Sequence, residues 1–400
     1  MEKILIVGNG GRENALRWHL SQNDKVSEVV CISPKENFNN IEKLIRRKKI
    51  DLTIICSEEP LSQGIVDFLN LKGINGVFGP TRKMSLIESD KFYSYDLMDE
   101  LNIPQACSLK CSTLHEIFDA IGDFEQPVLK YRGLAGGKGV RVYSSQEEAE
   151  NDLENFVKTF GKNILVAERL HGKEFSIFGI ADGKNVAPFE VAFKDCKKLV
   201  DGDTGPNTGG MGAYGPVPFV SRELINKITD EIILPVVKKT NFKGFIYAGM
   251  MLCEDGIKVI EFNSRLGDPE TQPMVMLLES NLYDSIKSSL EGNVEKSSVK
   301  FKKGAACCVV LASRGYPENY NVGFSISGIS EAEKMEGIKV FHAGTKFENN
   351  SWTTNGGRVL DITSYSSDGI NPARKLAYEA VSKINIPGGF HYRKDISLIV

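Results

Sequence analysis

The sequence predicts a multidomain protein that combines the α/β and α+β classes. The chain has 400 residues, more than one hydrophobic core normally serves. Its first part alternates strand-like apolar runs with helix-like amphipathic runs, a pattern typical of a parallel sheet covered by helices. Further along, the runs 245–252 and 257–263 follow each other across a short turn, as in an antiparallel hairpin. Parallel and antiparallel sheets are therefore expected in separate domains.

The composition argues against several classes of protein. Hydrophobic residues make up 41% and charged residues 25% of the chain, as is ordinary for a soluble globular protein. The net charge of −3 gives no basic field for general nucleic-acid binding. No apolar run approaches the length of a membrane span, and the N-terminus enters strand 3–7 without the layout of a signal peptide. We expect a cytoplasmic protein without nucleic-acid or membrane partners, in which the eight cysteines stay reduced.

Residues 1–101 are predicted to form a Rossmann-like domain. Strand 3–7 leads through the glycine-rich turn 8–13 into a helix, a layout in which free N–H groups and the helix dipole favour an anion. The dinucleotide fingerprint needs a small residue where Glu13 stands, so this turn is only weak evidence for an NAD site. A tight turn without a ligand explains these glycines equally well when they are considered alone. The remaining elements are predicted as strands at 26–33, 52–56 and 77–78 and helices at 41–48, 61–71 and 84–101.

Residues 102–300 are predicted as a second domain, with a lid subdomain at about 112–180. Strand 127–130 is followed by a loop, 132–140, that is rich in glycine and carries Lys138. This loop is not a Walker A loop, because Arg132 and Gly139 stand at two positions of its signature. A glycine loop with a lysine can still close over phosphates, although a plain hairpin tip is the alternative. A helix at 147–160 and strands at 164–170 and 173–181 complete the lid region.

The second half of this domain holds the most concentrated polar residues. Segment 201–215 is read as a long irregular loop, which in a compact domain is usually functional or disordered. Strand 257–263 ends in Glu261 and Asn263, which period-two alternation places on one face, and Arg265 would continue that face if the strand held. Oxygen ligands suit a hard cation such as Mg²⁺, and a guanidinium beside them suits an anion with developing charge. Helices are predicted at 222–240 and 273–290.

Residues 301–400 are predicted as a small β-rich C-terminal domain. Its strands surround one helix at 372–384, and strand 305–311 contains two of the cysteines. The turn Gly356-Gly357-Arg358 is a further candidate for binding an anion. The three domains are therefore expected to contribute separate anion-binding turns.

Six blocks together resemble the ATP-grasp superfamily and, within it, the phosphoribosylamine–glycine ligase family. They span nearly the whole chain, and the block Asp203–Tyr214 is long enough to be very specific. The blocks are Asn9–Glu13, Gly79–Thr81, Gly133–Val140, Asp203–Tyr214, Ile260–Pro273, and Phe341–Lys346 together with Asn355–Val359.

The resemblance implies a two-subdomain ATP-grasp fold and an ATP-dependent ligation of glycine to 5-phosphoribosylamine through a glycyl phosphate, a step of purine biosynthesis. It implies Mg²⁺ or Mn²⁺ held by Glu261 and Asn263, and catalytic roles for Arg265 and Asp268. The ATP-binding residues would be Lys91, Lys130, Gly136, Gly137, Lys138, Gly139, Ala167, Glu168, Leu170 and Glu174. The substrate-binding residues would be Asn9, Gly10, Gly11, Arg12, Glu13, Asp203, Gly209, Gly210, Met211, Thr271, Gly356, Gly357 and Arg358. A monomer or weak dimer is expected.

Several positions depart from the usual pattern of this family. Asn14 stands where the family usually has His, and Cys196 and Lys198 stand where His and Arg are often found. Strand 247–251 carries no acid that could serve as a second metal ligand. Two alternatives follow: another ATP-grasp carboxylate–amine ligase with changed substrates, or an inactive nucleotide-binding regulatory protein. The retained Glu261, Asn263, Arg265 and Lys138 favour an enzyme.

Overall fold

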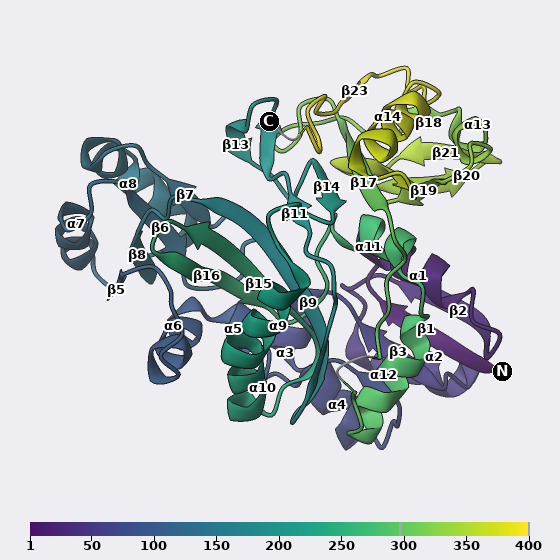
Figure 1. The fold of residues 1–400 in the computed structure, drawn as a ribbon, viewed down its shortest axis with the longest axis horizontal. Coiled ribbons are helices and arrows are strands. Elements are labelled where there is room, and N and C mark those ends of the chain that lie inside the picture. The colour runs from purple at the N-terminus through teal and green to yellow at the C-terminus, as the bar shows by residue number, and fades with distance from the viewer. Residues whose placement is uncertain (296–297, 399–400) are drawn as a thin grey trace.

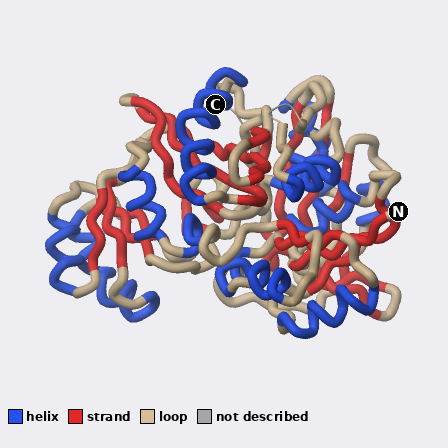
Figure 2. The backbone as a smooth tube through the Cα atoms, turned by 90° about the horizontal axis from the view of Figure 1, so that it is seen from below, coloured by secondary structure: helices blue, strands red, loops and turns tan. Residues whose placement is uncertain are grey.

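The computed structural model describes residues 1–295 and 298–398. Figure 1 shows an elongated molecule with a lid at one end and two further lobes at the other, joined by a central antiparallel sheet. The same separation of the lid is visible in the perpendicular view of Figure 2. None of the helices in the described ranges is long and apolar enough to cross a membrane. The predicted combination of α/β and α+β architecture is confirmed.

The N-terminal lobe is built on a parallel sheet, as the alternating pattern predicted. Its strands lie in the order β2-β1-β3-β4 and all pair in parallel. Successive residues of β1 point to opposite faces, so Ile4 and Ile6 pack under α1 while Leu5 and Val7 pack under α2 and α4. The bounds are β1 Glu2–Val7, β2 Val26–Ile32, β3 Leu52–Ile55, β4 Val77–Phe78, α1 Gly11–Leu20, α2 Phe38–Lys48, α3 Glu58–Gln63 and α4 Ile65–Leu71.

The lid is a four-stranded antiparallel sheet covered by two helices. Its strands lie in the order β5-β8-β6-β7, and the glycine-rich loop 132–139 is the tip of the β6–β7 hairpin. The lid has a hydrophobic cluster of its own around Phe156, which makes it a separate packing unit. The bounds are β5 Ser108–Cys111, α7 Leu114–Gly122, β6 Pro127–Tyr131, β7 Val140–Val142, α8 Gln146–Phe160 and β8 Ile164–Glu168.

A second antiparallel sheet, ordered β10-β9-β15-β16, forms the centre of the molecule. The predicted hairpin is confirmed, with Tyr247 paired to Asn263 and Gly249 paired to Glu261. The bounds are β9 Lys173–Asp182, β10 Val186–Pro188, β15 Lys243–Cys253, β16 Gly256–Asn263, α9 Arg222–Ile228, α10 Leu234–Thr240, α11 Thr271–Leu277 and α12 Leu282–Glu291.

The C-terminal lobe contains a six-stranded sheet that includes strands from the middle of the chain. The strands β11 and β14 join β17, β22 and β19, with β23 paired to β17. Segment 201–215, expected to be irregular throughout, therefore contributes β13 and the buried strand β14. The bounds are β11 Lys194–Asp195, β12 Lys198–Val200, β13 Thr204–Asn207, β14 Gly212–Gly215, β17 Ala305–Ser313, β18 Ser325–Ile326, α13 Ile329–Glu333, β19 Ile338–His342, β20 Thr345–Glu348, β21 Ser351–Thr354, β22 Arg358–Ser366, α14 Ile370–Val381 and β23 Phe390–His391.

Three predicted helices are interrupted, and a fourth contains an irregular turn. Helix 61–71 is split at Gly64, which adopts φ +87° and ends α3. Helix 84–101 is split at Asp90 into α5 Leu86–Ser89 and α6 Lys91–Glu100, because the Asp90 side chain caps α6. Helix 273–290 is two helices, and Asn281 caps the second. Helix 222–240 is continuous but passes through a π-helical turn at 229–233. Periodicity alone did not reveal these breaks.

Candidate active site

The end of β16 presents the polar face that the sequence predicted. Asn263 is buried, and its Nδ2 donates to Glu261 Oε1 at 3.3 Å, so the two side chains lie next to each other. Arg265 NH2 donates to Asn263 Oδ1 at 3.1 Å. The strand end therefore joins a carboxylate, an amide and a guanidinium in one contiguous row.

The positive charges of three lysines act on the Glu261 carboxylate. Burial would raise the pKa of Glu261, but Lys197, Lys91 and Lys130 lower it below its ordinary value. Lys130 is buried and donates to Tyr95 Oη at 2.7 Å, which fixes its ammonium. The net positive charge around one ionised carboxylate suits a polyphosphate with a divalent cation.

Lys197 was not identified from the sequence, although it is central to this cluster. Its ammonium forms an ion pair with Glu174, and the positive charge also acts on Glu261 and Asp195. It lies in the short connection between β11 and β12, where no motif signals its direction. Glu174 was expected to face a ribose, and in the structure its carboxylate pairs with Lys197.

The predicted adenine-side residues lie at the end of β8 and in the turn that follows it. Ala167 is fully buried in the strand, and Glu168 accepts a hydrogen bond from the Cys107 backbone N–H at 3.0 Å. Leu170 is half-buried in the turn that leads into β9. These residues lie at the junction of the lid and the central sheet, next to the strand that carries Glu174.

Two glutamates from the N-terminal part of the chain hold the Arg265 guanidinium. Arg265 NH2 lies 2.9 Å from Glu88 Oε1, and Nε lies 3.4 Å from Glu58 Oε2. Burial would raise the pKa of Glu58, but Arg265 and Arg12 lower it to about 2. No role for Glu88 was predicted from the sequence. Glu58 directly follows β3, at the sheet edge where ligands of parallel sheets usually bind.

The predicted glycine turn of the N-terminal lobe lies beside the end of β16. Arg12 is buried, and its NH1 donates to the carbonyl of Leu266 at 3.0 Å. Gly10 N–H donates to Glu13 Oε2 at 2.8 Å, and a Cβ on Gly10 would lie 3.6 Å from Asp268 Oδ2. The turn thus faces Asp268, while Arg12 and Glu13 hold it in place and Asn9 is exposed.

Arg358 connects three of the predicted blocks. Its NH2 donates to Asp268 Oδ2 at 2.8 Å, and NH1 donates to the backbone carbonyls of Asp268 and Gly209. Gly209 N–H donates to Tyr316 Oη at 2.9 Å, which fixes the loop from the other side. The turns at 209–210, 266–270 and 356–358, which are far apart in sequence, therefore meet at one guanidinium.

Five other predicted residues have mainly structural surroundings. Asp203 accepts a hydrogen bond from Arg393 NH1 at 2.7 Å, and Met211 is fully buried beside β17. The Thr271 hydroxyl is fully buried and donates to the carbonyl of Gly267 at 2.6 Å. Gly356 and Gly357 bring the backbone close to Gly344 and Tyr316. These contacts are with backbone and side chains outside the Glu261-Asn263-Arg265 row.

The lid loop reaches across to the other lobes. Lys138 Nζ lies 3.5 Å from the carbonyl oxygen of Pro317, and a Cβ on Gly137 would lie 3.5 Å from that of Thr208. Gly136 and Gly137 adopt positive φ angles of 55° and 79°, which favour glycine, and Gly139 is buried against Tyr131. The loop has an exposed lysine at its tip and lies close to Pro317 and Thr208.

Gly210 leaves no space for a side chain at the centre of the site. Its φ is +108°, and a Cβ there would lie 2.4 Å from Pro269 Cδ and 2.7 Å from Asp195 Oδ1. We expect Gly210→Ala to lower the free energy of unfolding by about 3 kcal/mol, from backbone strain and overpacking. Urea denaturation measures this.

Gly202→Ala is the matched control for Gly210→Ala. Gly202 also has a positive φ, +72°, but a Cβ there would meet nothing within 4 Å. We expect the free energy of unfolding of Gly202→Ala to fall by about 1 kcal/mol, from backbone strain alone. Equal losses in the two variants would contradict the steric explanation.

Within the described ranges, no group of three or more His, Cys, Asp or Glu side chains is arranged so that it could hold a metal ion. Glu261 and Asn263 offer two oxygen-bearing groups, and Mg²⁺ usually takes one or two such ligands together with substrate phosphates and water. The donor set therefore fits a metal that arrives with a nucleotide. All eight cysteines are free, as expected.

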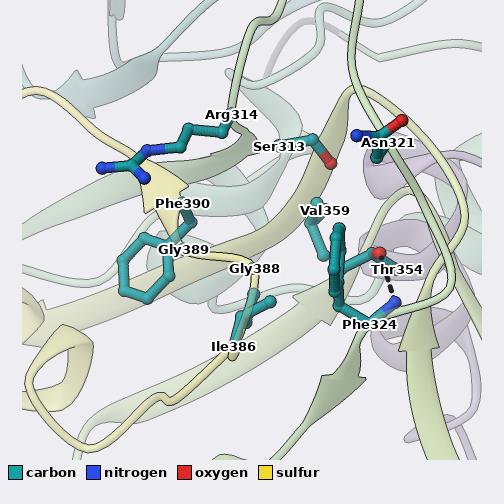
Figure 3. Close-up of a pocket in the computed structure, with 10 residues that line it drawn as sticks. All are labelled: Ser313, Arg314, Asn321, Phe324, Thr354, Val359, Ile386, Gly388, Gly389 and Phe390. Atoms are coloured by element: carbon teal, nitrogen blue, oxygen red, sulfur yellow. Dashed lines mark hydrogen bonds between the residues drawn. The ribbon is translucent and has the colours of Figure 1, made fainter.

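A cavity of about 140 Å³ lies in the C-terminal lobe (Figure 3). Phe324, Val359 and Phe390 form its apolar wall, and none of the predicted site residues lines it. Ser313, at its edge, donates its hydroxyl hydrogen to the carbonyl of Gly356 at 2.8 Å. The cavity thus backs onto the turn that carries Arg358 and is separate from the polar cluster.

Comparison with known proteins gives the same family for every part of the chain. Sequence models of the N domain, the ATP-grasp (A) domain and the C domain of phosphoribosylglycinamide synthetase match residues 2–88, 89–271 and 306–398. A phosphoribosylamine–glycine ligase of Caldanaerobacter subterraneus subsp. tengcongensis is 37% identical, with 99% of both chains covered. The human trifunctional purine biosynthetic protein adenosine-3 is 39% identical over 98% of this chain and 41% of its own length.

Solved structures agree with the sequence matches. The phosphoribosylamine–glycine ligase of Thermotoga maritima superposes with a TM-score of 0.82 at 30% identity, with 99% of this chain and 100% of that chain covered. A biotin carboxylase of Campylobacter jejuni shares the fold at a TM-score of 0.76 with only 13% identity, over 98% of this chain and 93% of that chain. The full-length relatives, the three matching domains and the shared fold show that this chain belongs to the phosphoribosylglycinamide synthetase family, whose middle domain is an ATP-grasp domain.

Proposed function

We propose that this protein is an ATP-dependent carbon–nitrogen ligase that joins glycine to 5-phosphoribosylamine in purine biosynthesis. The products are glycinamide ribonucleotide, ADP and phosphate. One observation carries the proposal: the Glu261-Asn263-Arg265 row lies between a lysine-rich nucleotide side and the glycine turn of the N-terminal lobe. The names of the full-length relatives specify the substrates.

The nucleotide side of the site lies between the lid and the central sheet. Lys91 and Lys130, which act on Glu261 electrostatically, would bind ATP phosphates, and the loop 136–139 would close over them. The adenine would meet the end of β8 at 167–170, with Glu174 near the ribose. Glu261 and Asn263 would hold Mg²⁺ or Mn²⁺, which when bound neutralises phosphate charge.

The proposed reaction has two steps. A glycine carboxylate oxygen attacks the γ-phosphorus of ATP, and the bond to the ADP oxygen breaks, giving glycyl phosphate and ADP. The amine of phosphoribosylamine then attacks the glycyl carbonyl carbon, phosphate leaves, and the amine loses a proton. Arg265 would stabilise charge on the transferring phosphoryl group, because its guanidinium is held in place by Glu58 and Glu88.

The other substrate contacts come from the turns that Arg358 connects. Gly10 and Gly11, at the start of α1, would lie against the sugar phosphate at the positive end of that helix, with Arg358 nearby. Asp268, between Gly10 and Arg358, would orient the amine and glycine. Loop 209–211 and Thr271 would shape the glycine pocket, and Asp203, Gly356 and Gly357 would support it.

A coupled assay of ADP release tests the proposal. Purified protein is incubated with ATP and Mg²⁺, and glycine and phosphoribosylamine are omitted in turn. Turnover that requires both substrates supports the proposed reaction. No turnover with both present would refute it, and turnover with another acid and amine would indicate changed substrates. ATP binding without any turnover would indicate a regulatory protein.

We also propose that the protein acts in the cytoplasm as a monomer or weak dimer. The free cysteines are compatible with a reducing compartment. Sedimentation velocity over a range of concentrations measures the association state.

A further inference from the structure

Behind the substrate side of the site, Gln272 joins two carboxylates through one amide nitrogen. Its Nε2 donates to Asp268 Oδ1 at 2.9 Å and to Asp361 Oδ2 at 2.7 Å. Asp361, on β22, is 1% exposed, and Gln272, on α11, is fully buried. Asp361 Oδ1 and Gln272 Oε1 are both buried without a hydrogen-bond partner in the described ranges. Such a buried arrangement is costly for an ionised carboxylate.

The charges around this group also favour a neutral Asp361. Asp268 already pairs with Arg358, while Arg12 on α1 pairs with Glu13 and Glu58. If Asp361 were ionised, two carboxylates would therefore share the single positive charge of Arg358. Burial and the Asp268 charge raise the pKa of Asp361 from 3.8 to about 7, against the opposing effect of Arg358.

The ionisable groups that face Asp361 come from several elements. Asp268 faces it from the turn after β16, Arg358 from its own strand, and the Cys308 thiol from β17. Burial and Asp361 raise the pKa of Cys308, so this thiol adds no charge at neutral pH. The protonation of Asp361 is thus governed mainly by burial, Asp268 and Arg358.

Asp361 also touches the glycine turn of the N-terminal lobe. A Cβ on Gly11 would lie 2.0 Å from Asp361 Oδ2 and 2.7 Å from Gln272 Nε2, so these side chains press directly on the Gly11 backbone. Gly11 is the first residue of α1, at the positive end of that helix dipole. A negative charge on Asp361 would act at the same place as the phosphate of the sugar substrate.

We propose that Asp361 is a positioning residue that acts in its neutral form. It braces Gln272 and Gly11, so that Asp268, Arg358 and the glycine turn keep the geometry that binds the sugar phosphate. Ionisation of Asp361 adds a negative charge behind that turn and weakens binding of the phosphorylated substrate. This inference rests on the proposed function, since it takes Gly10 and Gly11 as the phosphate subsite.

Steady-state kinetics of the wild type and Asp361→Asn, which keeps the shape without the charge, test the inference. Between about pH 6 and about pH 8.5, the KM for phosphoribosylamine should rise on the order of tenfold more in the wild type than in the variant. The KM values for ATP and glycine should change equally in both proteins. Because titration of the substrate affects both proteins, only the difference between them reports Asp361.

Urea denaturation from about pH 4 to about pH 8 gives a readout that does not need activity. The folded state holds the Asp361 proton more tightly than the unfolded chain, so this contribution to stability is full below pH 3.8 and is lost as pH rises through about 7. The wild type should lose stability relative to Asp361→Asn across that window. Asp368→Asn, at an exposed aspartate following the same strand, should match the wild type at every pH.

The two experiments separate failure of the inference from failure of the function. Identical pH dependence of stability in the wild type and Asp361→Asn would overturn the inference. So would an equal rise of the KM for phosphoribosylamine in both proteins, or a change in the KM for glycine or ATP alone. Absence of turnover in every protein would refute the proposed function, and the denaturation data would still decide the protonation of Asp361.

Discussion

Replacing Arg265 with lysine is expected to reduce turnover by about two to three orders of magnitude while the affinity for ATP changes little. In the guanidinium, NH2 contacts Glu88 and Asn263 and NH1 donates to the Leu266 carbonyl, while Nε lies 3.4 Å from Glu58 Oε2 without a hydrogen bond. A lysine ammonium keeps one charge but cannot make these contacts in one plane. The charge would therefore no longer be fixed where the transferring phosphoryl group passes.

Rapid-quench kinetics and ATP binding by calorimetry measure the two effects of Arg265→Lys separately. Arg46→Lys is a matched control, because Arg46 is an exposed arginine of α2 that pairs with Glu42 within its own helix. It should leave both quantities unchanged. Wild-type turnover in Arg265→Lys would remove Arg265 from the chemistry, and a parallel loss of ATP affinity would indicate a role in binding.

The row at the end of β16 could be predicted from the sequence because it depends on local geometry. Strand alternation alone places Glu261 and Asn263 on one face, and the structure keeps them within hydrogen-bonding distance. The glycine turn after β1 was predicted on the same basis, since the strand, the turn and the helix are consecutive. Patterns that are local in sequence were thus sufficient for these parts of the site.

The groups that hold this row in place could not be predicted in the same way. Glu88 and Glu58 contact Arg265 across about two hundred residues of chain, and a single charged residue in a helix usually indicates only a solvated surface. Lys197 depends on how the connection between β11 and β12 turns, which no periodicity specifies. Asp361 reads as one polar residue within an apolar strand until the fold brings Gln272 and Gly11 against it.

The architecture shows the same division between local and long-range information. The N-terminal parallel sheet follows from alternating strands and helices, and the structure confirms it. The C-terminal sheet recruits β11 and β14 from the middle of the chain, a pairing that only tertiary contacts establish. This recruitment matters for the site, because it carries the 209–210 loop to Arg358.

Glu261→Gln is expected to lower turnover by about two to three orders of magnitude and to raise the metal concentration needed for half-maximal activity more than tenfold. Glutamine keeps the length and one carbonyl oxygen, but it removes the only negative charge of the proposed metal pair. The three lysines around this position would then be less neutralised, so nucleotide without metal should bind at least as tightly as in the wild type. A simple packing defect would not produce these opposite changes.

Titration of activity with Mg²⁺ and with Mn²⁺, and calorimetry of ATP with and without metal, measure the two parts of the Glu261→Gln prediction. Glu254→Gln is the control, since Glu254 is exposed at the turn of the same β15–β16 hairpin. It should behave as the wild type in every titration. An unchanged metal requirement in Glu261→Gln would move the metal to other ligands. On the neighbouring strand, position 261 is paired with Gly249, and residues 247–251 contain no acid. Asn263 and the nucleotide phosphates would then be the groups to test next.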